Sequence, residues 1–290
     1  MRSSEVPAMK HETLRHEALA PDVLMFVGND HQSVATAFLD GDDALLVDSL
    51  GSSEDAHALR RILCGEMGKT VRAVAATHFM SDHIAGMRLF PDALTIAHRH
   101  YRHTFLAQNR RVDAFYREPQ LLFDTALSLR WGRHRLRFVH NPGKTMDHVS
   151  VDAPEADLVC VGDAIVGNIV YLSRADPELI HGAIGRIRRF GRGRVVGGHV
   201  GHFPAAVLDN AIHYLQQLRA RVVRIRAGTA PVAVADLIAA IPIEDCLAPG
   251  VEASAFERRW HRHNLELIPA QSVFELDTSL EEMAAAEVAV

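Results

Sequence analysis

Long apolar runs are missing from this sequence of 290 residues. Its apolar stretches, such as residues 44–47 and 71–76, are strand-sized and much shorter than the roughly 20 residues that a membrane-spanning helix requires. Residues 1–17 are polar, carry charges of both signs and lack the apolar segment of a secretory signal. We therefore expect a cytoplasmic protein that does not insert into a membrane.

Aromatic residues and positive charge are also scarce. Aromatic residues make up 6% of the chain and the formal net charge is −5, so neither base stacking nor a broad basic surface favours nucleic-acid binding. One basic cluster, residues 186–194, is interpreted as a solvated helix end and turn in preference to a phosphate-binding patch. The chain has three cysteines, far apart in sequence, which predicts reduced thiols in the core instead of disulfides.

Histidine, in contrast, is abundant, with 18 residues. Imidazole is a common metal ligand and titrates near neutral pH, so metal or acid–base chemistry is expected. Two histidines and an aspartate follow the apolar run 71–76 within six residues, in the segment Thr77-His78-Phe79-Met80-Ser81-Asp82-His83. A strand that ends at such a turn and leads into a helix places several ligand-type side chains at one edge of a sheet. The alternative is that these are ordinary polar groups at a strand end and a helix N-terminus.

The order of the expected elements indicates an α+β protein. Short apolar runs typical of strands alternate with segments of helical periodicity, among them residues 52–66, 99–115, 177–190 and 205–227. Strands outnumber helices, which fits two sheets covered by helices better than one doubly wound parallel sheet. A second histidine group, His98, His100 and His103, is expected at the exposed start of a helix.

With four further motifs, the segment from Thr77 to His83 resembles the metallo-β-lactamase superfamily, which includes hydroxyacylglutathione hydrolases, quorum-lactone hydrolases and flavodiiron proteins. The family's central motif, His-x-His-x-Asp-His, is matched at three of its four ligands. The other motifs follow in the family's order: Asp48 after an early strand, Pro142-Gly143-Lys144-Thr145 in place of Pro-Gly-His-Thr, Gly162-Asp163, and Gly198-His199. The resemblance runs from about residue 23 to residue 202.

The resemblance implies a four-layer αβ/βα sandwich of the metallo-β-lactamase type. We expect residues 21–228 to form this domain. Residues 1–20 are expected to be an N-terminal extension, and residues 229–290 a C-terminal flank packed on the core or extending from it.

Two positions depart from the family's pattern, and both belong to the first of its two metal sites. That site uses the first two histidines of the central motif and the histidine of the Pro-Gly-His-Thr turn, and the matching residues here are His78, Met80 and Lys144. A thioether is a weak ligand for zinc or iron, and a lysine ammonium has no lone pair. The second site keeps its two carboxylates and two imidazoles.

The resemblance therefore implies one divalent metal per chain, with zinc first and iron or manganese as alternatives. The residues that it assigns to the metal centre are His78, Asp82, His83, Asp163 and His199. Lys144 and Asp82 are expected to take part in catalysis, Lys144 by supplying part of the positive charge of the missing metal. The alternatives are that Lys144 forms a salt bridge with Asp163 in an inactive site or points to solvent. His148 is expected to form hydrogen bonds to a ligand without binding the metal.

These features predict a metal-dependent hydrolase that acts on a small-molecule ester, thioester or lactone. A non-catalytic, ligand-binding protein of the same fold is the alternative, because the first site is degenerate. Iron-dependent oxygen or redox chemistry is a weaker alternative, since flavodiiron relatives replace the second histidine of the motif by Glu whereas this chain has Met80. The sequence does not identify the substrate, and it leaves a homodimer open.

Overall fold

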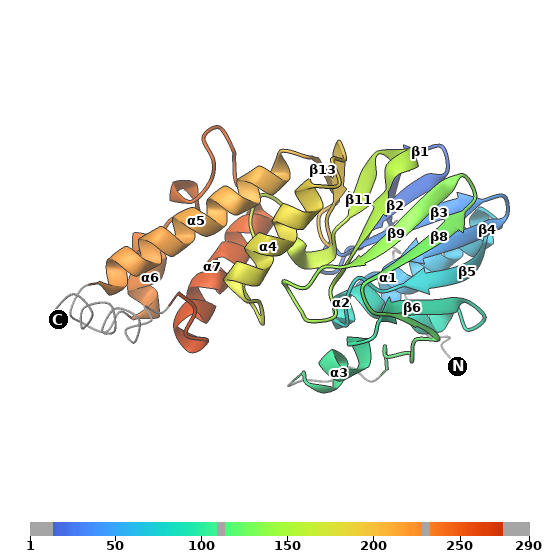
Figure 1. Ribbon diagram of the computed structural model, residues 1–290, viewed down its shortest axis with the longest axis horizontal. Coiled ribbons are helices and arrows are strands. Elements are labelled where there is room, and N and C mark those ends of the chain that lie inside the picture. The colour runs from blue at the N-terminus through green and yellow to red at the C-terminus, as the bar shows by residue number, and fades with distance from the viewer. Residues whose placement is uncertain (1–13, 109–113, 228–232, 275–290) are drawn as a thin grey trace, which may run out of the picture.

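In the computed structural model, two β-sheets pack face to face beside groups of helices (Figure 1). The structure describes residues 14–108, 114–227 and 233–274. Residues 1–13 of the expected extension, the expected boundary at residue 228 and residues 275–290 of the expected flank lie outside the described residues. No helix in the described part of the chain is long and apolar enough to span a membrane.

The first sheet has the strand order β1-β2-β3-β4-β5-β6-β7. Its strands are β1 (Arg15–Ala20), β2 (Val23–Val27), β3 (Val34–Asp40), β4 (Asp43–Val47), β5 (Thr70–Ala75), β6 (Leu94–His98) and β7 (Leu121–Phe123). Strands β1 to β4 form an antiparallel meander, whereas β4 to β7 are parallel. The parallel strands are connected through α1 (Ser53–Arg60) with the π-helical turn Arg61–Glu66, α2 (Ser81–Ile84), and α3 (Tyr101–Leu106).

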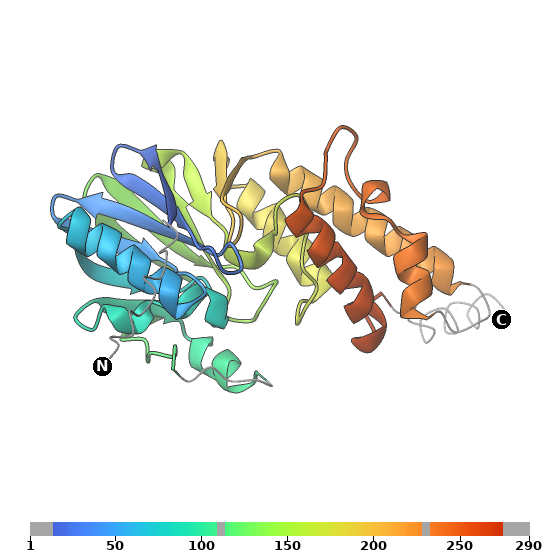
Figure 2. The same ribbon diagram turned by 180° about the vertical axis from the view of Figure 1, so that it is seen from behind.

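The second sheet has the order β13-β12-β11-β10-β9-β8, and within it only β11 and β12 are parallel neighbours. Its strands are β8 (Ala126–Trp131), β9 (His134–His140), β10 (Val149–Ala153), β11 (Leu158–Cys160), β12 (Arg194–Val196) and β13 (His202–Pro204). The helices of this half are α4 (Pro177–Arg188), α5 (Val207–Arg226), α6 (Val234–Ala240) and α7 (Ala255–Ala270). They lie together at one end of the sheets (Figures 1 and 2).

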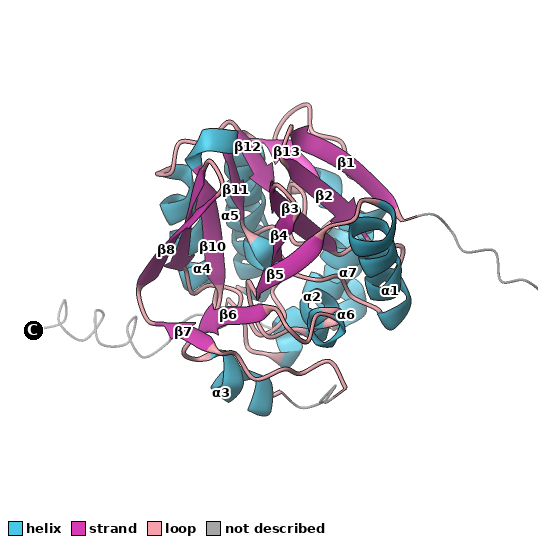
Figure 3. Ribbon diagram, turned by 90° about the vertical axis from the view of Figure 1, so that its right-hand side faces the viewer, coloured by secondary structure: helices cyan, strands magenta, loops and turns pink. Residues whose placement is uncertain are grey.

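Alternating side chains along the strands enter separate hydrophobic cores. In β2, Val23 and Met25 belong to the core between the two sheets, whereas Leu24 and Phe26 belong to the core between the first sheet and its helices. The two-residue period of a strand causes this division. A third core joins β11 and β12 to α4, α5 and α7. The layers are helix, sheet, sheet and helix (Figure 3), so the expected four-layer αβ/βα sandwich is confirmed.

Helix α7 is tied to the segment between β11 and α4. At its start, Ser254 and Glu257 form a capping box, which fixes the first turn. The Glu257 carboxylate also accepts hydrogen bonds from the backbone and the side-chain nitrogen of Asn168, at 2.6 and 3.0 Å. Asn264 accepts a hydrogen bond from the Leu172 backbone at 2.8 Å and donates one to the Val170 carbonyl at 2.7 Å. Because buried polar groups are costly to leave unpaired, these bonds hold α7 against residues 168–172.

Two segments differ from the sequence-based expectation. Residues 15–20, expected within the N-terminal extension, form strand β1 and pair with β2. Most of its side chains are exposed, because β1 is an edge strand, and this explains why it carries no apolar pattern. The helix expected over residues 99–115 comprises only α3 among the described residues, and residues 109–113 lie outside them.

The basic cluster of residues 186–194 makes contacts within the fold. Arg186 donates to Asn141 Oδ1 at 2.6 Å, and Arg188 forms an ion pair with Asp209 at 2.9 Å. Arg192 forms an ion pair with the buried Asp152 at 2.6 Å. These guanidinium groups are therefore occupied in holding a helix end and turn in place.

His98 is buried, so the expectation of an exposed histidine at this position is wrong. Its ring stacks on that of His140, with centroids 3.7 Å apart and an interplanar angle of 9°. His98 Nδ1 accepts the His100 backbone N–H at 3.2 Å, so its Nε2 carries the proton and donates to the Asp124 carbonyl at 2.7 Å. The bond that Nδ1 accepts requires the neutral ring, because a protonated Nδ1 has no free lone pair. Burial and the neighbouring His140 lower the pKa of His98 to about 4.

We expect the variant His98→Gln to fold with less sensitivity to acid than the native protein. Because the folded-state pKa of His98 is lowered from 6.5 to about 4, its contribution is present above pH 6.5 and is lost as the pH falls toward 4. The native free energy of unfolding should therefore fall over this interval by roughly 1–2 kcal/mol more than that of the variant. Urea titrations at the two ends of the interval measure the difference.

The control for this measurement is His103→Gln, which removes an exposed histidine from α3. It should keep the native pH dependence. An identical pH dependence in all three proteins would contradict the role assigned to His98.

Candidate metal centre

The chemically important side chains lie at one edge of the two sheets, where strands end. Asp48 follows β4 and His78 comes shortly after β5 in the first sheet, while Asp163 and His199 follow β11 and β12 in the second. Because β4 and β5 are parallel neighbours, as are β11 and β12, the carboxyl ends of each pair reach the same edge. The turn after β5 leads directly into α2, which carries Asp82 and His83.

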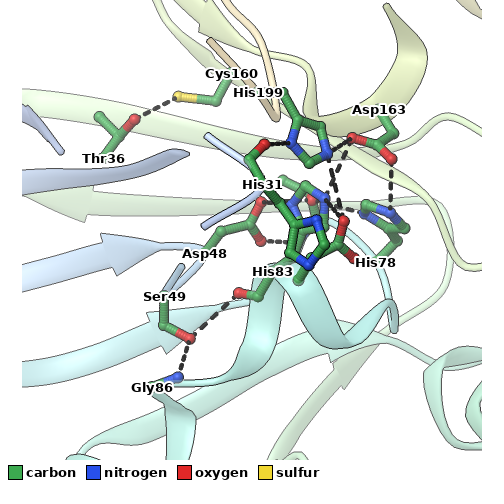
Figure 4. Close-up of polar contacts among 12 residues, drawn as sticks. His31, Thr36, Asp48, Ser49, His78, His83, Gly86, Cys160, Asp163 and His199 are labelled. Atoms are coloured by element: carbon green, nitrogen blue, oxygen red, sulfur yellow. Dashed lines mark hydrogen bonds and ion pairs between the residues drawn. The ribbon is translucent and has the colours of Figure 1, made fainter. Parts of the chain in front are cut away.

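Asp163 lies at the centre of this group (Figure 4). Its Oδ1 is 3.2 Å from Nε2 of His83 and 3.2 Å from Nε2 of His199. Its Oδ2 is 3.6 Å from Nε2 of His78. Asp82 Oδ2 lies 3.5 Å from His199 Nε2 and 4.0 Å from His83 Nε2. The structure thus brings together all five residues that the resemblance assigns to the metal centre.

Neighbouring groups fix the orientation of two of the imidazole rings. Asp48 Oδ2 lies 3.0 Å from His83 Nδ1, and the same carboxylate accepts hydrogen bonds from the backbone and hydroxyl of Thr77, both at 2.7 Å. The backbone carbonyl of His31 lies 2.8 Å from His199 Nδ1. Both rings therefore direct Nε2 toward Asp163. The sequence did not predict that Thr77 and a backbone carbonyl help to position these rings, because neither role has a sequence motif.

Two glycines allow the close approach of these segments. A Cβ at Gly198 would lie 2.5 Å from Asp163 Oδ1 and 2.7 Å from His83 Cε1. A Cβ at Gly162 would lie 2.7 Å from Thr77 Oγ1, and the backbone there has φ +48°, which favours glycine. The Gly-Asp and Gly-His pairs in the sequence therefore have a steric cause.

The buried charges in the centre stabilise one another. Burial alone would raise the pKa of the Asp163 carboxyl, but the imidazoles of His83 and His199 outweigh it and hold that pKa well below its usual range. Burial opposes the charged form of His83 as well, and Asp163 and Asp82 raise the pKa of this ring well above its usual range. The buried carboxylates of Asp82 and Asp163 therefore need positively charged groups beside them.

The donor set fits a divalent cation. Among the described residues, Asp163 Oδ1, His78 Nε2 and His83 Nε2 are buried without a hydrogen-bond partner. The ligand atoms of Asp82, His83 and His199 all lie within 4.8 Å of one another. Those of His78, His83 and Asp163 form a second such group. A cation would satisfy these atoms, because carboxylate oxygens and imidazole nitrogens are ligands that zinc, iron and manganese accept.

Lys144 is fully buried beside this centre. Its Nζ donates a hydrogen bond of 3.4 Å to the Tyr171 carbonyl and lies 4.0 Å from the centre of the Tyr171 ring. Burial lowers the pKa of Lys144 to about 8, although Asp163 and Asp82 favour the charged form. This placement differs from both alternatives considered above, since Lys144 neither points to solvent nor forms a direct ion pair with Asp163 among the described contacts.

Met80 and His148 lie near the centre in different surroundings. Met80 packs against the core between the first sheet and its helices. The His148 ring is fully buried, 5.3 Å from that of His78, and neither of its nitrogens has a hydrogen-bond partner in the described part of the chain. Burial lowers the pKa of His148 well below its usual range. The hydrogen bond expected from His148 to a ligand is therefore not formed among the described residues.

Comparisons with known proteins identify the family and the fold. A family model described as the metallo-beta-lactamase superfamily matches residues 28–206. A metallo-beta-lactamase from Pontibacter korlensis has a similar structure, with a TM-score of 0.61 and 19% identity over 70% of this chain and 99% of that chain. A stereoselective inverting sec-alkylsulfatase from Pseudomonas sp. is similar with a TM-score of 0.69 and 13% identity, over 91% of this chain and 51% of that chain. Comparison with curated protein sequences finds no match.

The matched segment, residues 28–206, covers more than half of the chain and contains every residue of the metal centre. At identities of 19% and 13%, the similar structures show the fold alone. The sandwich architecture agrees with the family match. The chain belongs to the metallo-beta-lactamase superfamily.

Proposed function

We propose that this protein is a hydrolase that uses one metal ion, held by Asp82, His83, Asp163 and His199, together with the ammonium of Lys144. The observation that carries the proposal is the fully buried lysine at the position where the family has a third histidine ligand. Zinc is the proposed metal, with iron or manganese as alternatives. The metal would supply a Lewis acid, which lowers the pKa of water and stabilises negative charge on a substrate oxygen.

The first half of the centre lacks the family's ligand set for a second ion, and the remaining ligands His83 and Asp163 are shared with the first ion. His78 is its only imidazole at a family ligand position, because Met80 packs into an apolar core and Lys144 carries a proton. A cation placed there would also be repelled by the ammonium. These two properties support a stoichiometry of one metal per chain.

The Lys144 ammonium is proposed to hold the developing charge on the substrate. With a pKa of about 8, most of it is protonated at neutral pH. An ammonium has three N–H donors, and among the described residues Lys144 forms one hydrogen bond, to the Tyr171 carbonyl. The remaining donors are available to bind a substrate oxygen. Removing one such donor from an enzyme typically lowers kcat about 10²–10³-fold.

Asp82 is the carboxylate of the centre that reaches solvent. Its side chain is 22% exposed, whereas that of Asp163 is 4% exposed. Asp82 is therefore proposed to orient an attacking water by accepting its hydrogen bond while also contributing to the metal site. Its low pKa, which the two imidazoles maintain against the effect of burial, keeps it ionised for this task.

The proposed substrates are small-molecule esters, thioesters or lactones, in which negative charge develops on the carbonyl oxygen during attack. A sulfate ester is the second candidate. Its support is the likeness to the sec-alkylsulfatase, which covers 91% of this chain, compared with 70% for the metallo-beta-lactamase. The oxygens of a sulfate ester are charged before reaction begins, and they also suit a buried ammonium.

The purified protein is expected to contain at most one tightly bound metal ion per chain, as measured by elemental analysis. His199→Ala and Asp82→Ala should remove the metal, because each deletes a proposed ligand. Met80→Ala should retain it. Two tightly bound ions in the native protein, or equal loss in all three variants, would show that the first half of the centre also binds metal.

The variant Lys144→Met keeps much of the side-chain volume and removes the charge. We expect it to lower kcat/KM by more than tenfold, about 1.4 kcal/mol of transition-state stabilisation, without changing the metal content. Steady-state assays with ester, thioester, lactone and alkyl sulfate substrates would measure the effect. An active native enzyme that is indifferent to this change would rule out a catalytic lysine and leave the metal to act alone.

The double variant Met80→His with Lys144→His restores the family's full ligand set. Its metal content should rise toward two ions per chain, because ligand type is what the first half lacks. This variant also tests the non-catalytic alternative. If the native protein is inert toward all four substrate classes and the double variant hydrolyses one of them, the native protein has lost catalysis and Lys144 only neutralises the carboxylates.

A further inference from the structure

Three aromatic side chains connect the two sides of the metal centre. The ring of Phe256 lies 5.7 Å from that of the proposed ligand His199, measured between centroids. Phe256 and Trp260 are 5.8 Å apart, and Trp260 and Tyr171 are 4.4 Å apart. Tyr171 in turn lies under the Lys144 ammonium. These three residues, called here the aromatic arc, thus run from His199 to Lys144.

The arc is partly open to solvent. Tyr171, Phe256 and Trp260 are each partly exposed, unlike the fully buried aromatic residues Tyr101 and Tyr214 in the cores. Asp82, the carboxylate of the centre that reaches solvent, is also partly exposed. Large apolar side chains that stay partly exposed next to a cluster of charges provide a surface to which an apolar group can bind.

The arc is rigidly positioned. Phe256 and Trp260 are four residues apart on α7 and so project from the same face of the helix. Tyr171 lies between Val170 and Leu172, whose backbone groups are both bonded to the buried Asn264 of α7. A surface held in this way loses little entropy when a ligand binds.

The charges beside the arc select the kind of ligand. An aromatic cage often binds a quaternary ammonium group, but here the Lys144 ammonium already covers the Tyr171 ring. The exposed Arg174 is close enough to lower the pKa of Lys144, and it adds to the positive charge. The carboxylates of Asp82 and Asp163 offset part of this charge, but the proposed metal would neutralise them, and a cationic ligand would then be repelled. A ligand with an apolar chain and an anionic or carbonyl head would satisfy both features.

We propose that the aromatic arc is the binding site for the apolar chain of the substrate, so that the enzyme prefers acyl or alkyl chains of several carbons over short ones. The head of the substrate would then lie against Lys144 and the metal centre. This inference rests on the proposed function for the position of the head, but the preference for chain length can be measured without any hydrolysis.

The test compares acetate, butanoate and octanoate, which share one carboxylate head and differ only in apolar chain. Dissociation constants are measured by calorimetry with the full-length protein, both metal-loaded and after chelation. Each methylene that becomes buried should tighten binding about fourfold, so octanoate should bind at least tenfold more tightly than butanoate. Equal affinity for the three carboxylates would overturn the proposal.

Two variants locate the effect on the arc. Trp260→Ala should reduce the preference for octanoate over butanoate to less than threefold and leave the metal content and the affinity for acetate unchanged. Trp260→Phe, which keeps an aromatic ring, should preserve the preference. Arg262→Ala, on the exposed face of the same helix, is the matched control and should behave like the native protein. An unchanged preference in Trp260→Ala would overturn the proposal.

If Trp260→Ala does not fold, tryptophan fluorescence of the intact arc tests the proposal instead. The chain has two tryptophans, so the variant Trp131→Phe leaves Trp260 as the only source of tryptophan emission. Octanoate should shift this emission to shorter wavelength, whereas acetate should not. No shift at saturating octanoate would contradict binding to the arc.

Failure of this inference can be distinguished from failure of the proposed function. A protein that lacks metal and hydrolytic activity but still prefers octanoate would refute the proposed function and retain the arc. A metal-containing hydrolase without any preference for chain length would support the proposed function and refute binding to the arc.

Discussion

The enclosed carboxylate of Asp163 is the group on which the arrangement of the site depends. It lies 3.2 Å from two imidazoles, one of which follows the first sheet while the other belongs to the second. An isolated buried carboxylate would be costly, so both sheets must present positive charge or hydrogen-bond donors at this edge. The glycines at positions 162 and 198 follow from the same requirement, because any larger residue would separate the segments.

The proposed loss of one half of the family's metal site has a consistent electrostatic explanation. The carboxylates of Asp82 and Asp163 need compensation whether or not a second ion is present. In the proposed function this compensation in the first half comes from Lys144, which is fully buried and has a pKa of about 8. A lysine on a flexible four-carbon chain can supply charge without coordination, and it leaves N–H donors for a substrate oxygen. In the proposed function, Lys144 thus replaces the family's second metal ion as the source of positive charge.

The site also depends on helix α7, which lies outside the family match because that match ends at residue 206. Glu257 and Asn264 of α7 hold residues 168–172, and this stretch carries the carbonyl and ring that contact Lys144. Changes in α7 can therefore alter the position of Lys144 without touching the metal ligands. The same helix supplies two of the three aromatic residues proposed to bind the substrate chain.

The order of motifs in the sequence determined the family, the four-layer sandwich and the identity of the side chains at the centre, because ligand chemistry and strand-end position are local properties. The sequence also indicated that Met80 and Lys144 break the first half of the site. It did not reveal that Lys144 is enclosed against Tyr171, that His98 stacks on His140, or that residues 15–20 complete the first sheet. Each of these features depends on contacts between segments that are distant in the chain. An edge strand such as β1 also lacks an apolar pattern by which the sequence could predict it. Burial and charge environment arise only when the sheets and α7 pack together, so the tertiary structure alone revealed the enclosure of Lys144 and the presence of the aromatic arc.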